Sequence, residues 1–194
     1  MQRRRLIQGI ATATLLAPLL MLPGRVGSAL AATDNRRRRM LDDIQAQWRD
    51  FLPDGFEPVS VDEKVSLSRD EWRERLTQPL AFEVLRKEAT ERAGTSPLNE
   101  EKRDGVFLCA GCDLPLFTSE MKYESGTGWP SFFTTIPDVF ETKRDTLLFM
   151  PRTEYHCARC GGHHGHVFKD GPRPTGQRWC NNGAALRFVP KDAA

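Results

Sequence analysis

The sequence predicts a mainly β protein, in which short helices precede a compact antiparallel domain. From Val106 onward, short apolar runs alternate with turns that contain Gly or Pro, a pattern typical of antiparallel strands. Before that point, two segments combine helix-start signals with apolar residues at helical spacing. The runs that we expect to form strands are 106–108, 146–150, 166–168 and 185–189.

Residues 1–31 have the order of an export signal. Arginines at positions 3–5 precede an apolar run from Ile10 to Leu22, and small residues follow around Ala31. The paired arginines resemble a twin-arginine signal, and the apolar run is too short for a comfortable membrane span. We therefore expect a periplasmic protein, cleaved near Ala31, without stable membrane insertion afterwards. An uncleaved N-terminal anchor is the alternative.

Residues 32–64 are expected to form an extension or linker that contains a short helix. An arginine run at 36–39 is interpreted as the solvated start of that helix, and Pro and Gly after residue 52 end the pattern. The function of this segment cannot be derived from its composition. The apolar residues near helical spacing are Met40, Leu41, Ile44, Trp48 and Phe51.

Two further helices are predicted before the strands. Ser68 and Glu71 form a capping box, so one helix begins at about Arg69. A second helix is predicted to start at Pro79, since proline is favoured in the first helical turn. The residues expected to face inward from it are Leu80, Val84 and Leu85.

The charge balance argues against a nucleic-acid partner. The chain carries 28 basic and 26 acidic residues, and residues 1–31 contribute four arginines and no acid. Without that segment, 24 basic residues remain against 26 acidic ones. Nucleic-acid-binding proteins normally show a basic excess or a basic stripe.

Four of the five cysteines occur as two CxxC pairs, which predict a metal site. The pairs are Cys109 with Cys112 and Cys157 with Cys160. Four thiolates at this spacing suit one tetrahedral Zn²⁺, and a closed set of four is structural rather than catalytic. Two disulfides or a thioredoxin-type redox pair are the alternatives, although neither pair lies in the strand–turn–helix context of a redox motif.

The fifth cysteine, Cys180, has no partner in the pattern. In an extended segment, alternate side chains share a face, so Arg178, Cys180 and Asn182 are expected to point the same way. A guanidinium beside a thiol favours the thiolate, which is the nucleophilic form. The alternative is that Cys180 is a small buried apolar residue.

Two more segments are rich in residues that can take part in catalysis or ligand binding. One reads YESGTGWPSF at 123–132, and the other reads HHGHVFKDGP at 163–172. Glycine-rich turns with a tryptophan are often corners of a core, and clustered histidines often lie on the surface. A second metal site at the histidines is not expected, because no spare carboxylate or thiolate cluster accompanies them in the sequence.

Taken together and in this order, the cysteine pairs, SGTGWPSF, HHGHVFKDGP and PTGQRWCNN resemble the methionine-R-sulfoxide reductases, the B-type peptide methionine sulfoxide reductases. The resemblance runs from about Ser68 to Val189. We therefore expect the reductase domain to span residues 65–190, with a short tail at 191–194. The resemblance implies two packed antiparallel β-sheets, and one structural zinc per chain at the end away from catalysis. It also implies reduction of the R epimer of methionine sulfoxide in oxidised peptides and proteins, a repair activity under oxidative stress.

The resemblance also implies roles for individual residues. Cys180 is the nucleophile that attacks the sulfoxide sulfur and becomes a sulfenic acid. Trp129 receives the substrate methyl group, for which an indole face is suited, and Phe168 helps to shape the pocket. A histidine, which titrates near neutral pH, protonates the leaving oxygen. The polar surround consists of His163, His166, Asp170, Arg178 and Asn182.

Three positions depart from the pattern of the family. Thr127 stands where many members carry a resolving cysteine, so we expect the sulfenic acid to be reduced by an external thiol or a thioredoxin-like partner. Gly183 and His164 replace a common Ser and a common Leu, and we expect them to affect access to the pocket. The competing classes are a non-catalytic zinc β-domain that binds a ligand, and a periplasmic thiol–disulfide oxidoreductase that uses its CxxC pairs.

Overall fold

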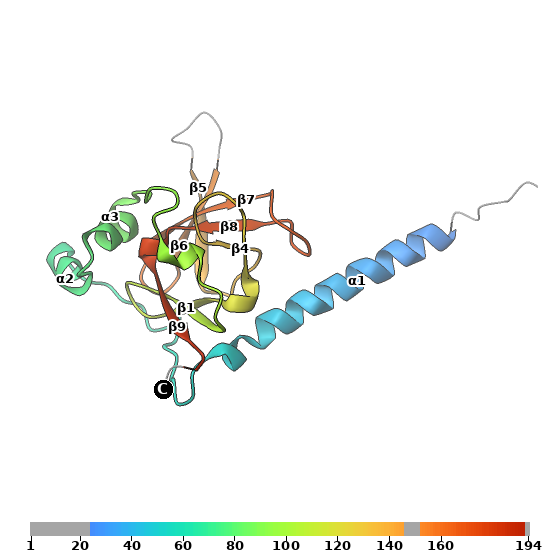
Figure 1. Cartoon of the computed structure of the whole chain (residues 1–194), viewed down its shortest axis with the longest axis horizontal. Coiled ribbons are helices and arrows are strands. Elements are labelled where there is room, and N and C mark those ends of the chain that lie inside the picture. Colours follow the sequence, from blue (N-terminus) through green and yellow to red (C-terminus); the bar gives the residue numbers. More distant parts are fainter. Residues whose placement is uncertain (1–23, 146–151, 193–194) are drawn as a thin grey trace, which may run out of the picture. The chain divides into compact units, whose positions relative to one another are not determined.

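The computed structural model describes residues 24–145 and 152–192 (Figure 1). The apolar part of the expected export signal and the expected strand at 146–150 lie outside these ranges. The chain divides into a first unit, Met1–Asn35, and a second unit, Arg36–Ala194. The described residues of the first unit are helical.

The N-terminal helix is longer than the sequence indicates. Helix α1 spans Gly24–Ala46, and the arginine run lies inside it rather than at its start. Trp48–Phe51 form a separate 3₁₀ turn, η1, so the expected short helix is two elements. Within the second unit, Gln45 donates to the Thr134 hydroxyl at 2.9 Å and the Thr135 carbonyl at 3.0 Å. None of the described helices is long and apolar enough to cross a membrane.

Helices α2, Arg69–Arg75, and α3, Pro79–Lys87, begin where the capping signals predict (Figure 1). The capping box is confirmed, with both reciprocal hydrogen bonds between Ser68 and Glu71. The prediction that Leu80 faces inward is wrong, since its side chain is 44% exposed. The buried stripe of α3 is centred near Ala81 and Leu85, which leaves Leu80 on the solvent side.

The strands form two antiparallel sheets, which confirms the expected fold class. The smaller sheet has the order β2-β1-β9 and the larger one β3-β4-β8-β7-β6-β5. The expected strands at 106–108 and 166–168 lie within β1 and β7, and 185–189 corresponds to β9 except that Ala185 belongs to a 3₁₀ turn. The strands are β1 Gly105–Cys109, β2 Pro115–Thr118, β3 Lys122–Tyr123, β4 Ser131–Phe132, β5 Phe140–Asp145, β6 Arg152–Cys157, β7 His163–Phe168, β8 Arg178–Asn181 and β9 Leu186–Pro190. The remaining 3₁₀ turns are η2 Pro97–Asn99, η3 Ser119–Met121 and η4 Gly183–Ala185.

Aromatic rings join the two sheets in one core. Phe132 of β4 stacks on Phe117 of β2 with ring centres 3.9 Å apart, and Phe107 of β1 meets it edge-on at 5.1 Å. Trp179 of β8 packs edge-on against Tyr155 of β6 at 5.0 Å. Since aromatic side chains contribute most of the apolar area of a core, the Phe132 contacts fix β4 against the smaller sheet, and the Trp179 contact fixes the core-facing side of β8 against β6. The alternate face of β8 is therefore left to carry polar groups.

Candidate functional site

Cys180 lies in the middle of the larger sheet. Strand β8 pairs with β4 on one side and β7 on the other, so that Cys180 is opposite Ser131 and opposite His166. Because Trp179 points into the core, the side chains of Arg178 and Cys180 project from the other face. The sheet thus presents the thiol between two neighbouring strands.

The thiol lines a cavity of about 120 Å³, together with most of the residues that the resemblance implies. His163, Asp170 and Arg178 are the described site residues that do not line it. The sequence-predicted residues at the cavity are Trp129, His166, Phe168, Cys180 and Asn182. The structure adds Gly165 and Asn181, which lie inside the HHGHVFKDGP and PTGQRWCNN motifs, and also Thr90 and Arg152, for which the sequence gives no signal.

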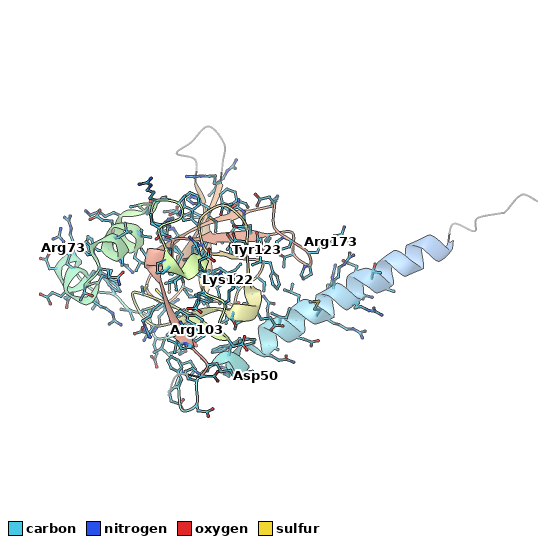
Figure 2. All side chains as sticks on the ribbon, in the orientation of Figure 1. Asp50, Arg73, Arg103, Lys122, Tyr123 and Arg173 are labelled. Carbon is cyan, nitrogen blue, oxygen red and sulfur yellow. The ribbon has the colours of Figure 1, made fainter. Side chains whose placement is uncertain are left out.

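Opposing effects set the protonation of Cys180. Burial raises the pKa of the thiol, while the Arg178 charge and hydrogen bonds from Thr127 and Arg178 lower it. The expected influence of Arg178 therefore has the right direction, but burial outweighs it, and the pKa lies above its ordinary value. Burial raises the pKa of Tyr123 on β3 (Figure 2), and the nearby charges also act on it, since Arg178 lowers this pKa while Asp170 and Cys180 raise it.

Arg178 and Asp170 form a bidentate ion pair beside the cavity. The Nε and Nη2 atoms of Arg178 each donate to one carboxylate oxygen of Asp170 at 2.9 Å. The guanidinium also lies 4.2 Å from the ring centre of Phe168, which lines the cavity. Its hydrogen bonds hold the pKa of Asp170 below the usual value. The pair thus orients Phe168 and keeps a fixed positive charge near Cys180.

A β-bulge brings His163 and His166 to the same side of β7. Tyr155 pairs with Gly165 but His156 pairs with His163, so β7 has one extra residue at this point. The two imidazole rings then lie 5.7 Å apart, although residues three apart in a regular strand face opposite ways. His163 is buried, and burial lowers its pKa. His166 is the histidine that lines the cavity.

Asn182 is held by the backbone of two distant segments. Its Oδ1 accepts from the Glu91 amide and its Nδ2 donates to the His164 carbonyl, both at 2.9 Å. Each polar atom of the side chain thus has a backbone partner, which fixes the orientation of Asn182 in the wall of the cavity. The Glu91 carbonyl also accepts from the Trp129 indole at 3.1 Å. Glu91 is a buried residue that sequence reasoning missed.

Two of the departures from the family pattern, His164 and Gly183, are buried and packed against neighbouring segments. His164 is fully buried, its Nδ1 lies 3.2 Å from Asn181 Oδ1, and burial lowers its pKa to about 3. A Cβ atom at Gly183 would lie 1.9 Å from the Ser96 hydroxyl. Neither residue lines the cavity, and their expected effect on access to it stays a prediction.

The four CxxC cysteines converge in one buried cluster, as the spacing predicts. Their ligand atoms all lie within 4.8 Å of one another, and Sγ separations are 3.7 Å for Cys109–Cys160 and 3.6 Å for Cys112–Cys157. Tetrahedral Zn²⁺ with bonds of about 2.3 Å requires sulfurs about 3.8 Å apart, so the donor set fits zinc. All four are free cysteines rather than disulfides.

The cluster lies away from the cavity and links the two sheets. Cys109 ends β1 of the smaller sheet, and Cys157 ends β6 of the larger one. Glu154 of β6 pairs with His166 of β7, which pairs with Cys180 of β8, so Cys180 lies at the level of Glu154 in the sheet. Cys157 lies three residues after Glu154 on β6, which is about 10 Å along the strand. Arg86 of α3 donates to the Cys160 carbonyl at 2.9 Å and its sulfur at 3.2 Å, which anchors the helix there.

Comparison with known proteins agrees with this architecture. A family model described as the SelR domain matches residues 77–190. Peptide methionine sulfoxide reductase B1, chloroplastic, of Arabidopsis thaliana is 48% identical over 137 residues, which cover 70% of this chain and 67% of the relative. Peptide methionine sulfoxide reductase MsrB of Pseudomonas putida is 49% identical over 134 residues, covering 68% and 99%. The corresponding protein of Leptospira interrogans is 47% identical over 126 residues, covering 64% and 95%.

Proposed function

The chain belongs to the peptide methionine sulfoxide reductase B family, and on that premise we propose that it reduces the R epimer of methionine sulfoxide in peptides and proteins. The observation that carries this proposal is the position of Cys180, whose thiol shares one small cavity with Trp129 and His166. A nucleophile, an aromatic wall and a proton donor are the three groups that sulfoxide reduction requires.

In the proposed reaction, the Cys180 thiolate attacks the sulfoxide sulfur. This attack forms an S–S bond, and the substrate oxygen is protonated. The S–S bond and the S–O bond of the substrate then break while the oxygen bonds to the Cys180 sulfur, so methionine leaves and Cys180 becomes a sulfenic acid. The substrate sulfur gains two electrons and the Cys180 sulfur loses two, so one oxygen atom is transferred. His166 is the proposed proton donor because it pairs with Cys180 across the sheet and lines the cavity.

Trp129 and Phe168 are the proposed apolar contacts of the substrate methyl group. The indole of Trp129 is anchored through its N–H to the Glu91 carbonyl, and Phe168 is held by the Arg178 guanidinium. Both rings are therefore oriented before substrate arrives, which lowers the entropic cost of binding a small group.

An external reductant is proposed to return Cys180 to the thiol. The other four cysteines are buried in the distant cluster, and Thr127 stands beside Cys180 where a resolving cysteine is common in the family. A small thiol or a thioredoxin-like protein would then attack the sulfenic acid directly. After one turnover without reductant, intact-mass analysis should show one added oxygen and no internal disulfide. A bond from Cys180 to a cluster cysteine would contradict this proposal.

The cysteine cluster is proposed to hold one structural Zn²⁺. Cys109, Cys112, Cys157 and Cys160 would supply all four ligands, leaving no open position for substrate. When bound, the ion supplies a crosslink between the two sheets.

Export is proposed from the sequence alone. The arginines at 3–5, the apolar run and the small residues near Ala31 support a periplasmic location. Amino-terminal sequencing of the protein recovered from a cell fraction tests it. A mature terminus near Ala32 in the periplasmic fraction is expected, and an intact terminus in the cytosol would contradict it.

The reaction itself is tested with zinc-loaded protein, dithiothreitol and a peptide that contains racemic methionine sulfoxide. Chiral separation should show consumption of the R epimer alone. The Cys180→Ser variant should consume neither epimer while it keeps its metal content and its fold. If the wild-type protein consumes neither epimer, the proposed activity is wrong and a binding module becomes the better interpretation.

A further inference from the structure

A second group of metal-binding side chains lies on the larger sheet, outside the cysteine cluster. The sequence offers no reason to expect it, because no spare carboxylate or thiolate cluster accompanies the histidines at 163–166. Pairing of β6 with β7 supplies a carboxylate, since His156 is opposite His163 and Glu154 is opposite His166. Glu154 and His156 are two residues apart on β6 and share a face.

The donor atoms of this group converge on one point. Glu154 Oε1 lies 3.1 Å from His156 Nε2, and the same oxygen is hydrogen-bonded to His163 Nδ1. The ligand atoms of all three residues lie within 4.8 Å of one another, and the two imidazole ring centres are 5.6 Å apart. Tetrahedral zinc with bonds of about 2.0–2.1 Å needs ligands about 3.3 Å apart, so small side-chain shifts would suffice.

Burial and charge favour a cation at this point. The side chains of Glu154 and His163 are 5% and 2% exposed, and that of His156 is 16% exposed, which leaves an approach from the His156 side. A buried carboxylate requires a positive partner. The present partner is Lys143, whose Nζ lies 3.1 Å from Glu154 Oε2 and 2.6 Å from Glu88 Oε1. Lys143 contacts the oxygen that faces away from the histidines, and its side chain is 51% exposed.

We propose that Glu154, His156 and His163 form a second metal site, which binds a divalent transition-metal ion of the Zn²⁺ type. Two imidazole nitrogens and one carboxylate oxygen are borderline ligands that suit Zn²⁺ rather than Mg²⁺ or Ca²⁺. Three protein ligands leave one position for water. The site is separate from the cysteine cluster, whose four ligands are all sulfur, and binding of the ion does not depend on the proposed reaction.

The experiment is a zinc titration of protein whose cysteine cluster is already filled. Equilibrium dialysis against Zn²⁺, followed by elemental analysis, should give two ions per wild-type chain and one per His156→Gln chain. The Cys180→Ser variant should keep two, which excludes a thiolate ligand from the cavity. Lys143→Ala should bind the second ion more tightly, by about fivefold, because a competing cation is removed.

A spectroscopic measurement identifies the ligands independently. Co²⁺ added to protein with Zn²⁺ in the cysteine cluster should produce weak d–d bands without thiolate-to-metal charge transfer. Retention of the cluster zinc by His156→Gln shows that this variant is folded, and Glu154→Gln provides a second loss-of-ligand test. One ion in the wild-type protein, or two in His156→Gln, would overturn the proposal, as would a thiolate charge-transfer band.

Discussion

Glu91 and Asn182 are joined by a hydrogen bond between residues 91 positions apart, from the Glu91 amide to the Asn182 Oδ1 at 2.9 Å. The Glu91 carboxylate continues this contact, accepting from the amides of Gly183 and Ala184 at 2.5 and 2.9 Å. Its carbonyl holds the Trp129 indole. One buried residue thus ties the aromatic wall of the cavity to the segment that follows the nucleophile.

Replacing Glu91 by Gln should impair both stability and catalysis. The amide group of Gln has one acceptor oxygen, so one of the two backbone amides loses its partner, at a cost of about 1–3 kcal/mol in the free energy of unfolding. Urea unfolding measures this cost. The backbone carbonyl that holds the Trp129 indole is kept, but the Glu91 side chain loses part of its hold on residues 183 and 184, which follow the cavity residue Asn182, so kcat/KM for the peptide sulfoxide should fall. Glu74→Gln, at an exposed position of α2, is the matched control and should change neither quantity. Unchanged kinetics in Glu91→Gln would show that the carboxylate contacts with residues 183 and 184 do not affect the cavity.

The reactivity of Cys180 should increase with pH into the alkaline range. Because burial raises its pKa above the ordinary value of 9.0, the protonated thiol persists to higher pH and the thiolate appears only above it. The pH dependence of alkylation of metal-loaded protein, followed by mass spectrometry, should give a midpoint above that of cysteine in the unfolded chain. A midpoint below the unfolded value would contradict the dominance of burial.

Arg178→Gln should move that midpoint to still higher pH. The variant removes the charge and the hydrogen bond that lower the pKa of Cys180, while burial remains. Arg103→Gln removes a guanidinium that lies 5.4 Å from the Phe188 ring at an exposed position (Figure 2), and it should leave the midpoint unchanged. An equal shift in both variants would point to net charge rather than to the local contact.

Removal of metal from the cysteine cluster should lower stability far more than loss of Cys180. The cluster connects the end of β1 with the end of β6, so without the ion the two sheets lose a crosslink, and structural zinc contributes directly to the free energy of folding. Cys112→Ser should reduce zinc to below one ion per chain at the cluster and lower Tm by more than about 10 °C. Cys180→Ser is the control, and its Tm should match that of the wild-type protein.

Phe132→Ala should destabilise the protein by about 3–5 kcal/mol, since it removes a buried ring between two others and leaves a cavity. Phe132 pairs with Trp179, next to Cys180, so activity should fall as well. Leu80→Ala, at a position 44% exposed, should cost less than about 0.5 kcal/mol in the same denaturation experiment. A large loss in the free energy of unfolding of Leu80→Ala would show that Leu80 faces inward, as the sequence indicates.

The features that could be predicted from sequence are those encoded by local spacing. The two CxxC pairs predict the cysteine cluster, and the period of two in an extended strand predicts that Arg178 and Cys180 share a face. Glu91, Glu154 and His156 could not be found in this way, because their roles depend on which strands and loops become neighbours. The bulge in β7 is equally invisible, since one extra residue in a strand leaves no mark on a sequence. Leu80 shows the same limit at the level of a single helical turn.

The arrangement of the cysteines determines how the oxygen atom of the sulfoxide can be held in the proposed reaction. All five lie in the described residues, four of them in the buried cluster and one at the cavity. In the proposed reaction, each chain therefore holds a single oxygen atom, taken from one substrate, and Cys180 is the one cysteine that lines the cavity. Under that proposal, the protein meets an external reductant once for every methionine that it restores, so its throughput follows the supply of thiols in its surroundings as closely as the supply of damaged protein.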